Sequence, residues 1–170
     1  DLVCAECEKK FGPYDQYAIE LLLQKENLHK PHIVNGQVVV WTIDQFDYKK
    51  LKLFIISVLW RSGASKLPQF NKIQLGLNLE KAKQCILNND PGDQNEFSFL
   101  LARFTDTIGL SITADPHPEG KGDAFGDLES YRFYLGAGYI AYVKVDKRPF
   151  PPQTLFAAAT ENKPLIILRR

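Results

Sequence analysis

The stretch LKLFIISVLW, residues 51–60, decides the fold, because it is the most apolar run in the chain. With its neighbours it predicts a helix over about 45–62 that is apolar on almost every side, and such a helix lies buried at the centre of a domain. Asp44 is the expected N-cap of this helix, and Gly63 is the residue expected at its C-terminal end. We therefore expect the remaining elements to pack around it.

Two further helices are expected, one on each side of that stretch. Apolar residues recur at helical spacing after Gly12-Pro13, which predicts a helix that begins there and ends before Pro31. A shorter helix is predicted over about 78–88, where Asn89-Asp90-Pro91-Gly92 stops it. The apolar face of the first helix consists of Tyr14, Tyr17, Ala18, Leu21 and Leu22.

Strand patterns dominate the second half of the chain. In the first half, Asn35-Gly36 favours positive φ and predicts a hairpin turn before a strand at Val38 to Trp41. The sequence thus predicts an α+β fold, with a helical N-terminal half packed against an antiparallel β-sheet from the C-terminal half. The expected C-terminal strands are Phe97 to Phe104, Tyr131 to Leu135, Tyr139 to Val145 and Leu165 to Leu168.

Composition limits the class of protein. The 170 residues, 45% of them hydrophobic and 24% charged, suit one globular domain. The net charge of +1 gives no global attraction to nucleic acid or to a membrane, although a local patch can still bind DNA. The sequence has no apolar run long enough to cross a membrane, and its three cysteines form no disulfide framework. We expect a cytoplasmic protein, and the absence of Met suggests a fragment or a processed chain.

Cys4 and Cys7 form the sharpest chemical motif in the sequence. Two thiolates with two residues between them chelate one zinc ion, but a structural zinc site has four ligands, so this is half a site. We predict a structural zinc here, and the competing interpretation is a pair of unligated thiols. His29 and His32 are candidate ligands by type, although a helix about 22 Å long would separate them from the cysteines. The simplest source of the missing ligands is an upstream segment or another chain.

Positive charge is concentrated around the central helix. It could contact phosphate groups, but the favoured interpretation is that lysine stems cover the rim of the helix and keep their ammonium groups in water. The residues concerned are Lys49, Lys50, Lys52, Arg61 and Lys66.

A polar loop over 115–127 offers a weaker candidate site. It holds His117 between two prolines, and its clustered carboxylates could bind a cation. A solvated loop has the same composition, so an enzyme that uses this loop is the least favoured hypothesis. The carboxylates are Asp115, Glu119, Asp123, Asp127 and Glu129.

Leu2 to Lys10 resembles the last segment of an HNH-type (His-Me finger, treble-clef) endonuclease module, in which a Leu-Cys-x-x-Cys-His stretch closes a zinc-supported fold. Glu8 stands where that family usually has His, so the resemblance implies a role for Glu8 as a catalytic-metal ligand, with a divalent metal. Phe46 to Phe54, Leu59 to Arg61 and Asn89 to Gly92 are similar to the tail of a bacterial group of HNH-associated proteins.

The resemblance also implies what is missing. The first cysteine pair and the catalytic His of the family would lie upstream, so residues 1–12 would be the remnant of a zinc-knuckle segment and residues 13–170 a single α+β domain. The expected function is the C-terminal accessory domain of an HNH-nuclease-like, DNA-acting protein. It would be a metal-dependent endonuclease only together with an upstream HNH half. The alternative is a non-enzymatic interaction or scaffold module with a protein partner.

Overall fold

The structure, a computed structural model, describes residues 5–105, 117–118 and 125–170. Its helices are α1 (Ala5–Ile19), α2 (Tyr48–Ala64), α3 (Asn78–Leu87) and α4 (Pro152–Leu155), with a π-helical segment η1 (Glu20–Gln24) and the 3-10 turns η2 (Glu26–Leu28) and η3 (Pro68–Phe70). Its strands are β1 (Lys30–Val34), β2 (Gln37–Ile43), β3 (Phe99–Arg103), β4 (His117–Pro118), β5 (Ser130–Gly136), β6 (Tyr139–Lys144) and β7 (Leu165–Arg169).

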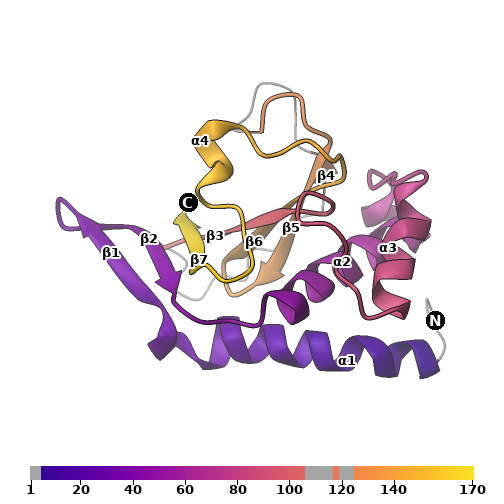
Figure 1. Ribbon diagram of the computed structural model, residues 1–170, viewed down its shortest axis with the longest axis horizontal. Helices are drawn as coiled ribbons and strands as arrows, with labels where there is room; N and C mark the ends of the chain where they lie inside the picture. The colour runs from indigo at the N-terminus through magenta and orange to yellow at the C-terminus, as the bar shows by residue number, and fades with distance from the viewer. Residues whose placement is uncertain (1–4, 106–116, 119–124) are drawn as a thin grey trace.

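All seven strands of the described residues belong to one sheet, in the order β1-β2-β7-β3-β6-β5-β4. The α+β class is confirmed. The sheet is mostly antiparallel, but β3 and β7 pair in parallel, and β1 and β2 join it from the N-terminal half. Helices α1 and α2 lie against one face, and α4 lies on the opposite side (Figure 1).

Each face of the sheet has its own apolar layer, because successive strand residues point to opposite sides. Along β6, Tyr139, Ala141 and Val143 pack toward the helices, whereas Ile140 and Tyr142 pack toward the layer that contains Phe125 and Phe150.

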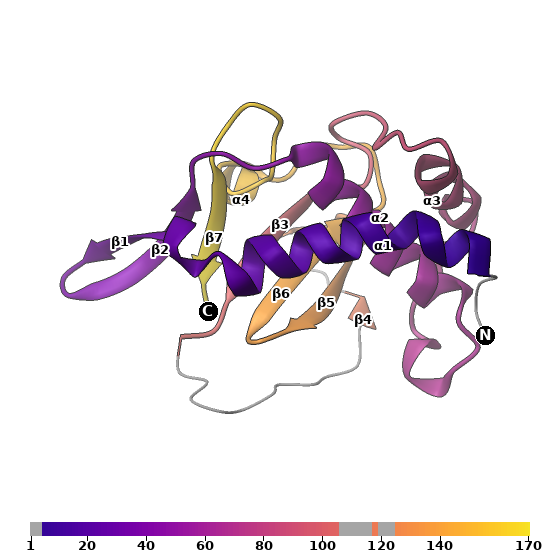
Figure 2. The same ribbon diagram turned by 90° about the horizontal axis from the view of Figure 1, so that it is seen from below.

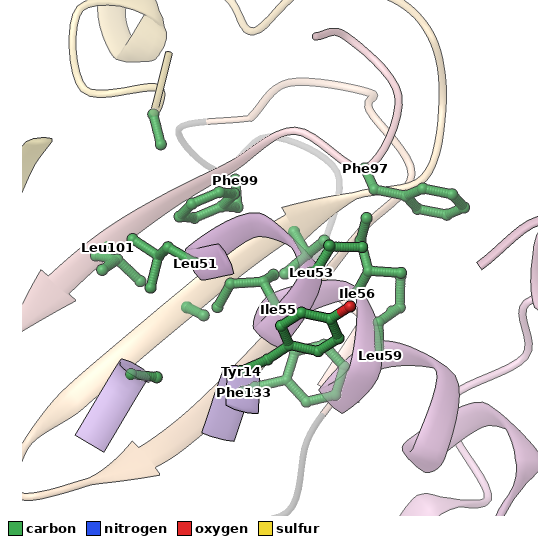
Figure 3. Packing of buried hydrophobic residues seen from close by; sticks show 14 of the residues in the cluster. Tyr14, Leu51, Leu53, Ile55, Ile56, Leu59, Phe97, Phe99, Leu101 and Phe133 are labelled. Carbon is green, nitrogen blue, oxygen red and sulfur yellow. The ribbon is translucent and has the colours of Figure 1, made fainter. Parts of the chain in front are cut away.

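The central helix α2 is buried as predicted, and it joins the layer between α1 and the sheet (Figure 3). Leu51, Leu53, Ile55, Ile56 and Leu59 are each at most 1% exposed. Its predicted ends are wrong.

The N-cap of α2 is Asp47 rather than Asp44, since Asp47 Oδ1 accepts from the Lys50 N–H at 2.9 Å. Gly63 lies inside the helix, where a Cβ would stand 2.6 Å from Leu75 Cδ1. Any larger residue there would force the Leu75 side chain to shift.

Helix α1 corrects the predicted break at Gly12-Pro13. It begins at Ala5 and runs through Pro13 to Ile19, so the domain boundary expected after residue 12 falls inside it. Proline inside a helix loses one hydrogen bond and costs about 3 kcal/mol. Burial of the apolar face offsets this cost, and so does a two-pronged ion pair between Asp15 and Arg61 of α2, with N–O distances of 2.8 and 3.1 Å. The buried residues of this face are Phe11, Tyr14, Ala18, Leu21 and Leu22.

The hairpin of β1 and β2 projects beyond the rest of the sheet (Figures 1 and 2). Its turn is the predicted one, with φ of 50° at Asn35 and 76° at Gly36. Pairing jumps from His32↔Val40 to Ile33↔Val38, which leaves Val39 as the extra residue of a β-bulge.

Candidate functional site

The cysteine pair lies at the start of a helix. Cys7 is the third residue of α1, while Cys4, one residue before the helix, is outside the described residues, as is the Cys7 side chain. A helix N-terminus carries partial positive charge and favours the thiolate form that binds metal. Glu8 follows in the same first turns of α1 and is exposed.

The structure does not bring His29 and His32 to this half-site. From Cys7 to Gln24 the chain is helical, which corresponds to about 25 Å along the axis. Both histidines follow the far end of that helical segment. If Cys4 and Cys7 bind zinc, they need partners other than these two histidines.

His29 instead belongs to a buried network. It is 8% exposed, its Nε2 lies 2.9 Å from the Leu21 carbonyl oxygen, and its Nδ1 lies 3.2 Å from the Tyr139 hydroxyl. A carbonyl only accepts, so Nε2 carries the proton and Nδ1 accepts from the tyrosine. Burial raises the pKa of Tyr139 to about 12, so the hydroxyl stays protonated and can donate. This arrangement fastens η1, which continues from α1, to β6.

The same network includes a guanidinium group. The Arg103 side chain lies 5.0 Å from the Tyr139 ring centre and 5.7 Å from that of Trp41, and it pairs with Glu26 at 2.9 Å. Its charge is therefore compensated, and its role is to cover the edge of the apolar layer.

His32 is exposed on β1. Its Nε2 lies 2.9 Å from Thr42 Oγ1 on the neighbouring strand. Among the side chains that the structure describes, which exclude those of Cys7 and His117, no three of His, Cys, Asp or Glu are grouped so that they could hold a metal ion. The zinc at the cysteines and the divalent metal at Glu8 remain predictions.

Lys52 and Lys144 are a feature that the sequence did not indicate. Both are 0% exposed, whereas Lys52 was expected at the helix rim. Lys52 Nζ donates to the Asp93 carbonyl at 2.7 Å. Lys144 Nζ donates to the Asp146 carbonyl at 2.9 Å and to that of Asn95. The two ammonium groups thus hold the loop between α3 and β3 in place.

Burial sets the protonation of these lysines. It lowers the pKa of Lys52 to about 8, partly offset by nearby Cys85 and by carboxylates, and it also lowers the pKa of Lys144. The signal that could have found Lys52 is its place inside the run 51–60: a helix apolar on all sides leaves no rim at which a lysine head could reach water.

A polar cleft of about 460 Å³ lies where α2 begins. Residues 44–49 line it on one side and residues 161–163 on the other. It carries acidic and basic side chains together. The Tyr48 hydroxyl, on the first residue of α2, is buried without a hydrogen-bond partner in the described part of the chain, and burial raises its pKa to about 12. No nucleophile with an adjacent base lines the cleft.

The acidic loop lies mostly outside the described residues. Asp115, Glu119 and Asp123 are not described, and His117 is described only as a strand partner of Arg132. Asp127 forms an ion pair with Arg148 at 3.1 Å, and Arg148 also pairs with Asp146 at 2.8 Å. The Glu129 carboxylate lies 3.5 Å from the Tyr131 hydroxyl, and burial raises the pKa of that hydroxyl. Asp127, one of the expected cation ligands, is thus already engaged in an ion pair.

In the described part of the molecule, no helix has both the length and the apolar character needed to cross a membrane.

Comparisons with protein-family models, with curated proteins and with solved structures found no match to this chain.

Proposed function

We propose that this chain is the C-terminal accessory domain of an HNH-nuclease-like, DNA-acting protein and is not itself catalytically complete. The observation that supports this most is the position of Cys7 in the first turn of α1, with about 25 Å of helix between it and His29 and His32. A half-site placed in this way needs a second pair of ligands from outside the α+β domain.

The remaining chemistry of the domain fits an accessory role. His29 is used in packing between Leu21 and Tyr139, and His32 has a hydrogen-bond partner in Thr42. A general base for phosphodiester cleavage needs a free imidazole beside a bound metal. The proposal therefore assigns the catalytic His and the first cysteine pair to an upstream segment, with Glu8 as a ligand of the catalytic metal.

The test is cleavage of supercoiled plasmid DNA by a longer protein that includes the upstream segment. We expect cleavage that depends on Mg²⁺ or Mn²⁺ and is lost when the upstream His is replaced by Ala. Glu8→Gln should weaken cleavage and leave the zinc content unchanged. A longer protein that leaves DNA intact across several divalent metals would rule the nuclease assignment out.

A second candidate is a non-enzymatic interaction module. Apolar side chains on the last turns of the α1–η1 segment favour it, since Ile19 is 43% exposed and Leu23 is 41% exposed. Exposed apolar groups of this kind mark protein interfaces when they cluster. A partner that is held by the native chain and released by Leu23→Glu, without any hydrolysis of DNA, would support this candidate over the first.

A further inference from the structure

We propose that the hairpin of β1 and β2 is the element that contacts DNA, lying as a two-stranded ribbon along a groove of the duplex. This inference rests on the proposed function, which brings DNA to the domain, and it goes further because it names the contacting surface.

The shape of the hairpin is the first support. It projects from the body of the protein, and β1 is the edge strand of the sheet, with all five of its residues exposed (Figure 2). The major groove of B-DNA, about 12 Å wide, admits a two-stranded β-ribbon. The turn at Asn35-Gly36 makes a narrow tip, and the bulge at Val39 marks a bend point in the ribbon.

The chemistry of the hairpin is the second support. No Asp or Glu occurs from residue 27 to residue 43. The exposed polar side chains of the ribbon include His32, Asn35 and Gln37. Amide side chains can pair with the adenine edge in the major groove, and small apolar groups contact the thymine methyl. The hairpin therefore presents hydrogen-bonding groups without a negative charge that phosphates would repel.

One arginine beside the ribbon, Arg169 of β7, supplies the electrostatic attraction. Arg169 donates to Gln37 Oε1 at 3.1 Å, to the Val38 carbonyl at 3.3 Å and to Thr105 Oγ1 at 3.2 Å. Arg170 donates to the Tyr142 hydroxyl at 2.5 Å. Arg170 thus lies over β6 and not at the ribbon. Within the part of the chain that the structure describes, the acceptors of Arg169 are neutral, so its positive charge is available to phosphate oxygens.

DNA fits this surface better than a protein strand does. An added strand needs a continuous row of backbone donors, but Pro31 removes one from the exposed edge, and Lys30 beside it is a further feature that discourages pairing. Ile33 and Val34 are 62% and 54% exposed, but as neighbours in a strand they point to opposite faces and do not form one apolar patch. Charge complementarity to the phosphate backbone therefore favours DNA over a protein strand as the partner of the hairpin.

The test measures, by fluorescence anisotropy at several salt concentrations, how tightly the 170-residue chain binds a fluorescein-labelled duplex of about 20 base pairs. Gln37→Glu places a carboxylate beside Arg169 and should weaken binding about tenfold, with a salt slope that is smaller by about one. The matched control is Gln69→Glu, the same exchange at an exposed position of η3, and it should bind as the native chain does. Circular dichroism melting establishes that both variants are folded.

Any one of four results would overturn the proposal. The first is that the native chain does not bind the duplex at low salt. The second is that Gln37→Glu and Gln69→Glu weaken binding equally. The third is that a single strand of the same length binds more tightly than the duplex. The fourth is that the hairpin proves to be buried in a complex with protein. Failure of the longer protein to cleave DNA would bear on the nuclease proposal alone, because this assay involves no cleavage.

Discussion

Alkaline pH should stabilise this protein, because the ammonium group of Lys52 is buried in the folded chain and solvated in the unfolded one. Burial lowers the pKa of Lys52 to about 8 in the folded state, whereas an unfolded lysine has a pKa of about 10.4. Between these two values the folded chain has released the proton and the unfolded chain still holds it. The unfolded state then binds more protons, so the free energy of unfolding rises with pH.

The two pKa values differ by about 2.4 units. At about 1.4 kcal/mol for each unit, this corresponds to about 3 kcal/mol of stability. This stabilisation is absent below about pH 8 and complete above about pH 10.4. Lys144 acts in the same direction, since burial also lowers its pKa. Cys85 acts in the opposite direction because burial raises its pKa. Tyr48 and Tyr139, with pKa values raised to about 12, reverse the trend above about pH 10.

The assay is urea unfolding of the chain with Lys52 and of Lys52→Met at several values between about pH 7 and pH 10. Both proteins carry Cys85→Ala, because the Cys85 thiol and Lys52 shift each other's pKa. The tyrosine contributions are common to both proteins, so they cancel in the difference. We expect the chain with Lys52 to gain about 2–3 kcal/mol relative to Lys52→Met over this range. If the free energies of unfolding of the two proteins change in parallel with pH, the assignment of a buried, easily deprotonated lysine is refuted.

Three further predictions concern stability and are read from urea or thermal unfolding. Gly63→Ala should cost about 1–3 kcal/mol because its Cβ would overlap a neighbouring side chain. Gly12→Ala, with open space around it inside α1, should instead stabilise the protein by about 1 kcal/mol. Equal effects of the two substitutions would contradict the packing described. Asp47→Ala should cost about 1 kcal/mol through loss of the N-cap of α2, and an unchanged stability would show that the cap contributes nothing. Tyr139→Phe should cost about 1–3 kcal/mol because His29 Nδ1 loses its donor, and a neutral exchange would mean that this bond is not formed.

Most of the fold could be predicted where local pattern and tertiary packing agree. The run 51–60 is apolar enough to require a buried helix, and Asn35-Gly36 has the backbone freedom that its turn demands. The β5–β6 hairpin follows from its glycine-containing turn. The parallel pairing of β3 with β7 could not be predicted, because the register of residues 66 positions apart, such as Ala102 and Leu168, depends on how the whole sheet assembles.

The failures occur where packing overrides a local rule. Pro13 is a helix breaker in isolation, but here the buried face of α1 outweighs the lost hydrogen bond. Gly63 is a residue type expected at a helix end. Here it lies inside α2 and lets Leu75 pack closely against the helix, which no local pattern reveals. For the candidate site, spacing alone predicted the separation of His29 from the cysteines, whereas the engagement of His29 by Tyr139, 110 residues later, required the folded chain.

The zinc content of this chain, measured by elemental analysis of the purified protein, tests the central claim most directly. The account holds that Cys4 and Cys7 are half of a site whose other ligands lie outside the α+β domain, so it predicts well below one zinc per chain. One zinc per chain that is lost in His32→Ala would contradict it, because the cysteines would then find their partners within the domain and the case for an upstream HNH half would fall.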